Sequence, residues 1–526
     1  MVDLARTSLC RGARALVLLA LFAPLSRAEV RLAPLFTDGA VLQADRPLAI
    51  WGKAEPGETV KVSFAGQTRY AATTREGRWM AMLDAVGAST TGQELVATAK
   101  SGSASVRDLL VGEVWLCSGQ SNMEWRVADS ADAAREIAAA RYPLIRHLAI
   151  THRTSAQPED EAGTSGWKPA LPEHAGDFSA VAYAFARDIH ERLGVPVGLI
   201  RSTWGGTPIE AWMSPMTLAG DPAFAVVGER WRAAEEAFPV ASAEFAANLA
   251  TWKTADTAAQ AKGEKLYQQW LQQNPRPRAP LGGPDHPWAP SGLYNAMINP
   301  LIPYAIRGIL WYQGESNTGR PDEYARLFPA LIAGWRQHLG QGELPFFWVN
   351  LAGFRPQDPS ETSWARLRDA QTATLAVPNT GQAVAIDLGD PRDIHPRNKQ
   401  EVGRRLALLA KRRVYDLVVD DTGPTFAAAT REGASLRVRF AEAAGALVAR
   451  LKPPQSVEVA GADGVFYAAS ARIERDALIV TAPQVREPVA VRYAWRNFPE
   501  ANLYGASGLP AVPFQAKVAV PPATAP

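Results

Sequence analysis

The chain has few cysteines, almost no net charge and, after its first residues, no long apolar segment. Cys10 and Cys117 are the only cysteines among 526 residues, and Cys10 lies in a predicted leader, so we expect no internal disulfide in the mature protein. The 55 basic and 53 acidic side chains leave a net charge of +2, which argues against nucleic acid or an anionic membrane as a partner. The 47% of hydrophobic residues can fill large cores, and the length suggests about two to four domains.

Residues 1–28 have the pattern of an export signal. Three arginines precede an apolar run over residues 15–25, and the segment ends in Ser26-Arg27-Ala28. An uncleaved membrane anchor is the alternative, but the run is shorter than the roughly 20 residues that cross a bilayer. We therefore expect cleavage after Ala28 and a mature protein in the periplasm or outside the cell.

The rest of the chain divides into three regions. Residues 29–108 and 415–520 carry short alternating runs between Gly and Pro turns, which predict two β-sandwich-like domains. Residues 109–414 alternate short apolar strands with longer helical stretches, which predicts an α/β domain with a parallel sheet covered by helices. Within it, a segment at about 218–280 is predicted to be a helical excursion. Residues 521–526 are predicted to be a disordered tail.

One serine stands at a predicted strand exit. Gly119-Gln120-Ser121-Asn122-Met123 directly follows an apolar run, and the N–H groups of a helix starting there would favour negative charge near Ser121. A serine hydroxyl becomes a nucleophile only with a base and with donors aimed at the oxyanion. Cys117 ends the same run, and we expect it to be a buried small side chain rather than a second nucleophile.

Two further strand exits carry candidate oxyanion donors. In Arg201-Ser202-Thr203-Trp204-Gly205-Gly206-Thr207, the paired glycines would let a backbone N–H approach a ligand closely, although an ordinary tight turn has the same composition. In Trp311-Tyr312-Gln313-Gly314-Glu315-Ser316-Asn317, side-chain amides can donate to an oxyanion without titrating. We prefer Gln313 for this role, keep Asn317 as the substitute, and expect Glu315 to orient a neighbour.

A fourth loop supplies the base. Of seven histidines, His395 stands out because it lies in a dense polar loop after an apolar run, with Asp393 two residues earlier to hold its tautomer. Two alternatives are a solvated loop histidine and a metal site, since Asp387, Asp390 and Asp393 are also potential ligands. The usual zinc signatures are absent from the sequence, so we expect no metal and no other cofactor.

The four blocks resemble those of the sialate O-acetylesterase family, a branch of the SGNH-type serine hydrolases. The matching segments are Trp115 to Glu124, Trp204 to Thr207, Trp311 to Asn317 and Asp393 to Pro396. The resemblance implies a three-layer α/β hydrolase domain in which Ser121 is the nucleophile and His395 the base. In the wider SGNH pattern the acid lies three residues before the histidine, where this chain has Arg392. The acid is therefore either Asp393 or absent, with a Ser–His dyad helped by a backbone carbonyl.

The resemblance implies a secreted serine esterase that removes O-acetyl groups from sugars, most specifically a sialate O-acetylesterase. We expect oxyanion donors from Ser121, Gly205, Gly206 and either Gln313 or Asn317. Aromatic residues near the blocks are candidates for a sugar-binding platform, foremost Trp204, Trp311 and Tyr312. The alternatives are an acetylxylan or other polysaccharide acetylesterase and, in a different class, a carbohydrate-binding protein without catalysis.

Overall fold

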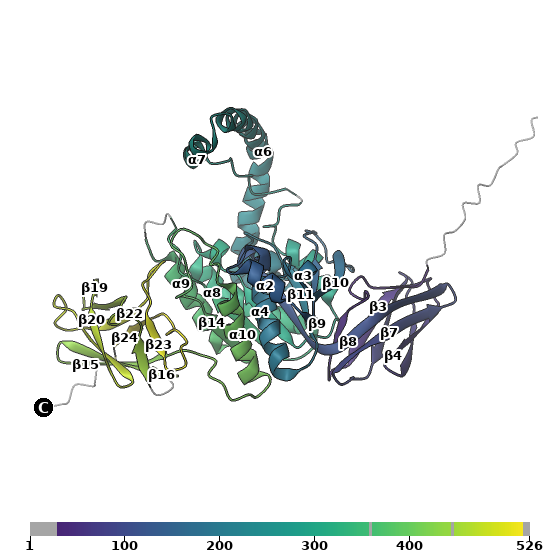
Figure 1. Cartoon of the computed structure of the whole chain (residues 1–526). Helices are drawn as coiled ribbons and strands as arrows, with labels where there is room; N and C mark the ends of the chain where they lie inside the picture. The colour runs from purple at the N-terminus through teal and green to yellow at the C-terminus, as the bar shows by residue number, and fades with distance from the viewer. Residues whose placement is uncertain (1–28, 284, 357–359, 443–445, 519–526) are drawn as a thin grey trace, which may run out of the picture.

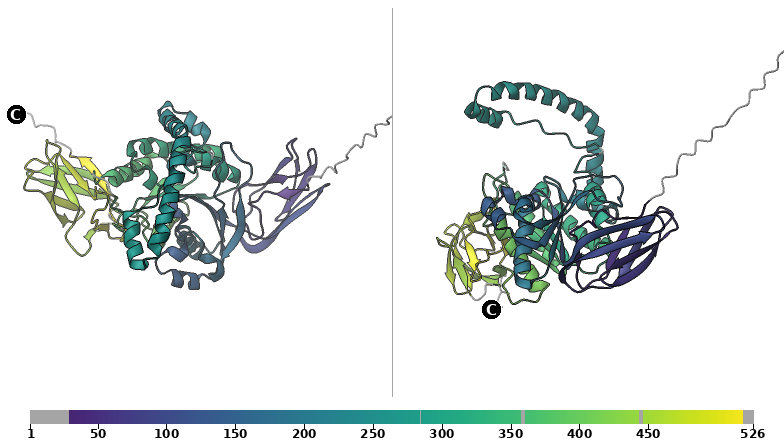
Figure 2. Two further views of the ribbon diagram at one scale, coloured as in Figure 1. Left: turned by 90° about the horizontal axis from the view of Figure 1, so that it is seen from above. Right: turned by 45° about the vertical axis from the view of Figure 1, so that its right-hand side comes forward.

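Three regions follow one another along the chain and in space (Figure 1). The structure is a computed structural model that describes residues 29–283, 285–356, 360–442 and 446–518. A β-rich region lies at each end of a central region of strands and helices, and both views in Figure 2 keep this order. The predicted export signal and C-terminal tail lie outside the described residues. Among the described helices, none has the length and apolar character needed to cross a membrane.

The central region is built on a mostly parallel sheet, as predicted. Its strands run in the order β10-β9-β11-β8-β12-β13-β14, with β10 antiparallel to β9 and the others parallel to their neighbours. The strands are β8 (Gly102–Gly119), β9 (Tyr142–Ile150), β10 (Thr164–Ala170), β11 (Val197–Thr203), β12 (Gly308–Tyr312), β13 (Phe346–Asn350) and β14 (Thr380–Val384). Strands β12, β13 and β14 are buried along their whole length. Burial on both faces explains why β12 and most of β13 are continuous apolar runs rather than alternating ones.

Helices between the strands carry the apolar faces that cover this sheet. The longer ones are α2 (Ala133–Ala139), α4 (Ala180–Leu193), α8 (Pro321–Leu339), α9 (Ser363–Ala373) and α10 (Lys399–Arg413). Helices α4 and α10 pack closely at Gly403, where an added Cβ would lie 2.5 Å from the carbonyl oxygen of Val181. This close packing anchors the start of α10, which follows the loop of His395.

Strand β8 joins the N-terminal region to the central sheet. Its first half pairs antiparallel with β7 (Ser89–Ala99), its middle pairs with β2 (Val41–Gln43), and its last part lies between β11 and β12. The boundary predicted at residue 108 therefore falls inside one continuous strand. The other N-terminal strands are β1 (Arg31–Leu32), β3 (Leu48–Lys53), β4 (Thr59–Phe64), β5 (Gln67–Ala72) and β6 (Arg78–Leu83).

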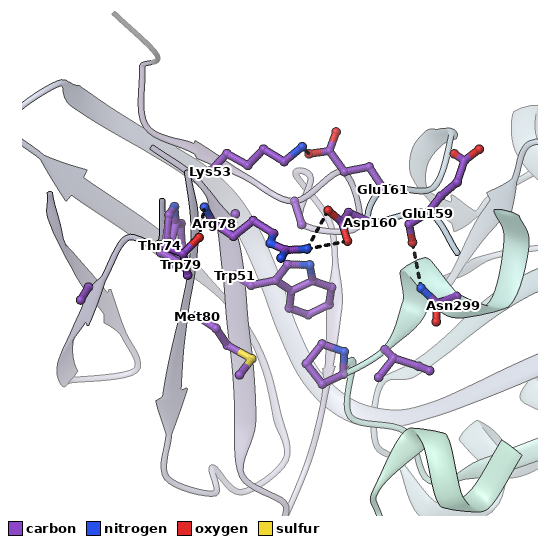
Figure 3. A pocket seen from close by; sticks show the side chains of 15 residues that line it. Trp51, Lys53, Thr74, Arg78, Trp79, Met80, Glu159, Asp160, Glu161 and Asn299 are labelled. Atoms are coloured by element: carbon purple, nitrogen blue, oxygen red, sulfur yellow. Dashed lines mark hydrogen bonds and ion pairs between the residues drawn. The ribbon is translucent and has the colours of Figure 1, made fainter. Parts of the chain in front are cut away.

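A cavity of about 250 Å³ lies where β3 and β6 meet residues 159–161 and 299–303 (Figure 3). Two ion pairs between its lining residues cross the junction: Arg78 Nη1 lies 3.0 Å from Asp160 Oδ2, and Lys53 Nζ lies 3.1 Å from Glu161 Oε1. The described residues that line it include none of those predicted for the active site. The cavity is thus a feature of the contact between the N-terminal and central regions.

The C-terminal region contains two four-stranded antiparallel sheets and a two-stranded one. Their orders are β15-β16-β21-β20, β19-β18-β22-β24 and β17-β23. Alternate residues of these strands point into one shared hydrophobic core. The strands are β15 (Thr425–Glu432), β16 (Ser435–Ala441), β17 (Leu447–Ala449), β18 (Val457–Ala460), β19 (Phe466–Ala468), β20 (Ser470–Glu474), β21 (Ala477–Thr481), β22 (Ala490–Tyr493), β23 (Leu503–Gly505) and β24 (Phe514–Lys517).

A helical arm projects from the central region in every view (Figures 1 and 2). It consists of α6 (Ala225–Gln260) and α7 (Glu264–Gln273), in the interval where the sequence predicts a helical excursion. Helix α6 contains Pro239 and curves along its length in Figure 2. The chain returning from the arm reaches the predicted active-site blocks, because Trp288 Nε1 donates a 2.7 Å hydrogen bond to the carbonyl oxygen of Gly206.

Candidate active site

Ser121 lies at the carboxyl edge of the central sheet, where β8 ends against β12. Gly119 has φ +131°, and an added Cβ would lie 2.2 Å from the carbonyl oxygen of Tyr312, so only glycine fits here. The next residue confirms the close approach, because the Gln120 N–H donates a 2.9 Å hydrogen bond to the same carbonyl. The short helix α1 (Ser121–Glu124) then begins, with the serine half-buried at its first position.

The structure brings Ser121 and His395 together although 274 residues separate them. His395 lies in the loop between β14 and α10, and its Nε2 is 2.9 Å from Ser121 Oγ. The imidazole stacks on the indole of Trp125, with 4.5 Å between ring centroids and 21° between planes. A hydroxyl at this distance from an imidazole nitrogen can pass its proton to the ring.

Asp393 lies beside His395, but its carboxylate also accepts hydrogen bonds from other donors. Its Oδ1 is 3.5 Å from His395 Nδ1, which is longer than an ordinary N–H···O hydrogen bond. The same oxygen accepts a 2.9 Å hydrogen bond from the His395 backbone N–H, and Oδ2 accepts one of 3.0 Å from Arg397. Asp393 thus contacts the imidazole electrostatically while its hydrogen bonds hold the loop.

The surroundings of His395 favour its neutral form. Burial is the largest cause that lowers its pKa below the usual 6.5, and the positive charges of Lys399 and Arg397 lower it further. Asp393 acts in the opposite direction. Because only the neutral imidazole can accept a proton from Ser121, this environment keeps the base available in mildly acidic solution.

Two of the predicted oxyanion donors are the backbone N–H groups of Ser121 and of Gly206. Gly206 belongs to the turn Gly205-Gly206, called the glycine turn below. Within the described part of the chain, no acceptor pairs with the Ser121 N–H or the Gly206 N–H. Gly205 packs against the serine, since an added Cβ would lie 3.2 Å from Ser121 Cβ. Its N–H, however, donates a 2.7 Å hydrogen bond to Glu124 Oε2. The prediction of Gly205 as a free donor is therefore wrong for this conformation.

The two side-chain amides predicted as donors are buried and already engaged. Gln313 is 0% exposed, and its Nε2 donates to Asn317 Oδ1 at 2.7 Å and to the Thr207 carbonyl at 3.2 Å. Asn317 in turn donates to Glu210 at 2.9 Å. One N–H of Gln313 thus ties the block Trp311 to Asn317 to the block Trp204 to Thr207, and the other holds Asn317 within its own block. The prediction that Gln313 or Asn317 faces the oxyanion is wrong.

The three aromatic residues predicted to contact the sugar differ in how deeply they are buried. Trp311 and Tyr312 are both 0% exposed, because both rings are packed in the core. The prediction that they contact substrate is therefore wrong. Trp204 is half-buried and stacks on His152, with 4.5 Å between centroids and 9° between planes. His152 Nε2 lies 2.9 Å from Glu124 Oε1. Trp204 is therefore the accessible one of the three predicted aromatic contacts.

The residues considered for the two alternative chemistries, a thiol nucleophile and a metal site, are engaged in other ways. Cys117 is fully buried, as predicted, and burial raises the pKa of its thiol. Asp387 is held by Arg405 at 2.6 Å, and Asp390 accepts a hydrogen bond from the Arg392 N–H. Among the residues that the structure describes, no three His, Cys, Asp or Glu side chains gather where they could hold a metal ion.

Two residues of the site were given no role from the sequence. Glu124 follows Ser121 within one helical turn, and Lys399 lies four residues after His395. Their proximity to the two reactive residues in the sequence is a signal that was available. Their roles depend on contacts across the fold, such as Glu124 with Gly205, which spacing alone does not reveal.

A hydroxyl and an imidazole in hydrogen-bonding reach, at the carboxyl edge of a parallel sheet, are typical of serine hydrolases. A family model described as carbohydrate esterase, sialic acid-specific acetylesterase, matches residues 111–273 and 259–411. The chain belongs to this family, which confirms the predicted resemblance, and it is a hydrolase of ester bonds.

Individual relatives match over nearly the whole chain. Sialate O-acetylesterase of Rattus norvegicus is 31% identical over 566 residues, covering 96% of this chain and 98% of its own. The Homo sapiens protein of the same name is 33% identical over 429 residues, covering 73% and 71%. The crystal structure of a carbohydrate acetylesterase from Xanthomonas citri has a TM-score of 0.77 at 36% identity, covering 93% of this chain and 99% of its own.

Proposed function

We propose that this protein removes O-acetyl groups from sugars, with Ser121 as nucleophile and His395 as general base. The 2.9 Å distance from Ser121 Oγ to His395 Nε2 is the observation that carries the proposal. We further propose that the central region is an SGNH-type three-layer domain and that the flanking regions are β-sandwiches. Export by residues 1–28 to the periplasm or the extracellular space belongs to the same proposal.

In the acylation step, His395 takes the proton of Ser121 as Oγ attacks the acetyl carbonyl carbon. The backbone N–H groups of Ser121 and Gly206 are the proposed donors to the oxyanion, since the described residues supply them with no other acceptor. The tetrahedral intermediate then collapses. The bond between the carbonyl carbon and the sugar oxygen breaks, and His395 returns its proton to that oxygen, which leaves as a hydroxyl.

In the deacylation step, His395 takes a proton from water as the water oxygen attacks the acetyl-serine. The ester bond to Oγ breaks, the proton returns to Ser121, and acetate leaves. Asp393 supports the imidazolium formed in each step through its charge, at 3.5 Å from Nδ1. We propose Trp204, stacked on His152, as the platform on which the sugar ring rests.

The substrate we propose is an O-acetylated sialic acid, on the strength of the matching family model and the mammalian relatives. The Xanthomonas citri relative is described more broadly as a carbohydrate acetylesterase, so an acetylated polysaccharide is the second candidate. Acetate release from O-acetylated sialic acid and from acetylxylan, measured side by side, distinguishes them. Faster release from sialic acid supports the first candidate, and release from acetylxylan alone supports the second.

A further inference from the structure

Behind the Ser121–His395 pair, the side chain of Asn122 connects three segments of the chain. Its Nδ2 donates to Glu315 Oε1 at 2.5 Å and to the carbonyl of Ile394 at 3.1 Å, and its Oδ1 accepts from Lys399 Nζ. Asn122 adjoins the serine and Ile394 adjoins the histidine. This one amide, 1% exposed, therefore fixes the distance between the two backbone segments that carry the reacting groups.

Lys399 is buried where neither solvent nor the helix stabilises its charge. It is the first residue of α10, and a positive charge at a helix N-terminus opposes the macrodipole. It is 0% exposed, and its Nζ lies 5.7 Å from the ring centroid of Trp125 and 5.5 Å from that of Tyr312. Burial lowers its pKa to about 7, while Glu315 acts in the opposite direction.

The burial of the Lys399 charge is not explained by a gain in folding stability. Replacing a buried charged network with apolar side chains of similar volume is often neutral or stabilising. The position of Lys399 instead matches a role at the site, because it holds Asn122 and lies near His395. In solution more acidic than its own pKa, Lys399 is protonated, and this is the range in which His395 titrates.

The groups that face His395 come from three elements, of which two carry charges. Asp393 and Arg397 belong to its own loop, and Lys399 comes from α10, while Ser121 and Trp125 face it as neutral groups. Asp393 is bound to Arg397, so much of its charge is compensated. The ammonium of Lys399 is linked through Asn122 to the carboxylate of Glu315.

We propose that Lys399 is a positioning residue: it holds Asn122, and through it the His395 loop, against Ser121, and its buried charge disfavours the protonated imidazole. This inference rests on the proposed function. Glu315 and Asn122 are the other members of the same chain of contacts. The arrangement gives the enzyme a neutral base at a fixed distance from the nucleophile.

The test is the pH dependence of kcat/KM for p-nitrophenyl acetate, measured on the full chain. The acid limb of this profile is the range in which kcat/KM falls as the pH decreases. We expect Lys399→Met to move the acid limb to higher pH by about 0.5 to 1 unit, because loss of the positive charge makes protonation of His395 easier. We also expect kcat to fall about 10- to 100-fold, because Asn122 is released. Lys399→Gln removes the charge but keeps a donor for Asn122, so it should shift the limb equally and lose less kcat.

Two controls make the outcome decisive. Lys411→Met alters a lysine of the same helix that pairs with Asp188 instead, and its acid limb should stay at the wild-type position. Lys399→Arg keeps the charge and should also keep the limb. If Lys399→Met does not fold, Lys399→Gln carries the test.

A wild-type acid limb in a folded Lys399→Gln or Lys399→Met variant overturns the inference. The proposed function has a separate readout, since Ser121→Ala must abolish turnover at every pH. An active Ser121→Ala variant would therefore count against the proposed function, whereas a wild-type limb in the lysine variants counts against this inference alone.

Discussion

Glu124 accepts a 2.7 Å hydrogen bond from the backbone N–H of Gly205, and Gly205 packs directly against Ser121. The other oxygen of the same carboxylate lies 2.9 Å from His152. Since Glu124 stands one helical turn after the serine, this contact fixes the glycine turn relative to the nucleophile. It also places the Gly206 N–H, which we propose as an oxyanion donor, on a turn held from both sides, because Trp288 binds the Gly206 carbonyl.

We expect Glu124→Ala to loosen this turn and lower kcat for p-nitrophenyl acetate about 10- to 100-fold, because small displacements of an oxyanion donor are costly. Glu124→Gln keeps an oxygen that can accept from Gly205 and should retain more of the rate. The melting temperature of both variants should stay near that of wild type, since the side chain is a quarter exposed. A Glu124→Ala variant with wild-type kcat would remove the turn contact from the mechanism.

Trp204 should affect the binding of sugars rather than the chemical step. Its ring is accessible and backed by His152, so Trp204→Ala removes the stacking surface while leaving Ser121 and His395 in place. We expect KM for an O-acetylated sugar to rise about tenfold, with kcat/KM for p-nitrophenyl acetate unchanged. Trp252→Ala, in the helical arm, is the matched control and should leave both values unchanged. An equal loss on both esters would assign Trp204 a structural role.

Gln313 should affect stability, because it is buried and both of its N–H bonds are used. Gln313→Ala leaves the buried Thr207 carbonyl without its donor and removes one of the two donors to Asn317 Oδ1, the other being the Ile209 N–H. An unpaired buried polar group costs about 1–3 kcal/mol. Thermal unfolding should then occur a few degrees lower, at about 2–4 °C per kcal/mol for domains of this size. Gln268→Ala in the exposed helix α7 should not change the melting temperature. A Gln313→Ala variant with wild-type melting would contradict this assignment.

The pH profile of the wild-type enzyme follows from the environment of His395. Because burial and nearby positive charge lower its pKa below 6.5, the neutral base persists into mildly acidic solution. Activity should therefore hold as pH decreases through 6.5 and be lost only when the pH falls through the lowered pKa. Measurement of kcat/KM for p-nitrophenyl acetate between about pH 4.5 and 9 checks this. An acid limb centred above 6.5 would show that the imidazole is stabilised in its charged form.

Sequence reasoning located residues best where the backbone alone determines position. Ser121 and His395 follow apolar strands, and the carboxyl ends of parallel strands meet at one edge of the sheet. The alternation of strands and helices likewise predicted the central sheet. The helical arm could be predicted from its composition, and its direction could not, because that depends on ion pairs at its base such as Arg230 with Glu323.

The same reasoning failed where the direction of a side chain decides its role. Trp311 and Tyr312 are the last residues of β12, and Gln313 and Asn317 follow it, as the pattern predicted. All four side chains nevertheless turn into the protein. A strand exit specifies where a residue lies along the sheet and not whether its side chain faces solvent or core. The burial of Lys399 was equally hidden, because it depends on a partner, Asn122, that is 277 residues away.

The role of Ser121 is tested most directly by the initial rate of p-nitrophenyl acetate hydrolysis, measured for the wild-type protein and for Ser121→Ala, with folding verified by circular dichroism. We expect the wild-type protein to hydrolyse the ester and the variant to lose at least about 1000-fold in rate while remaining folded. Equal rates for the two proteins would contradict the role of Ser121 as nucleophile.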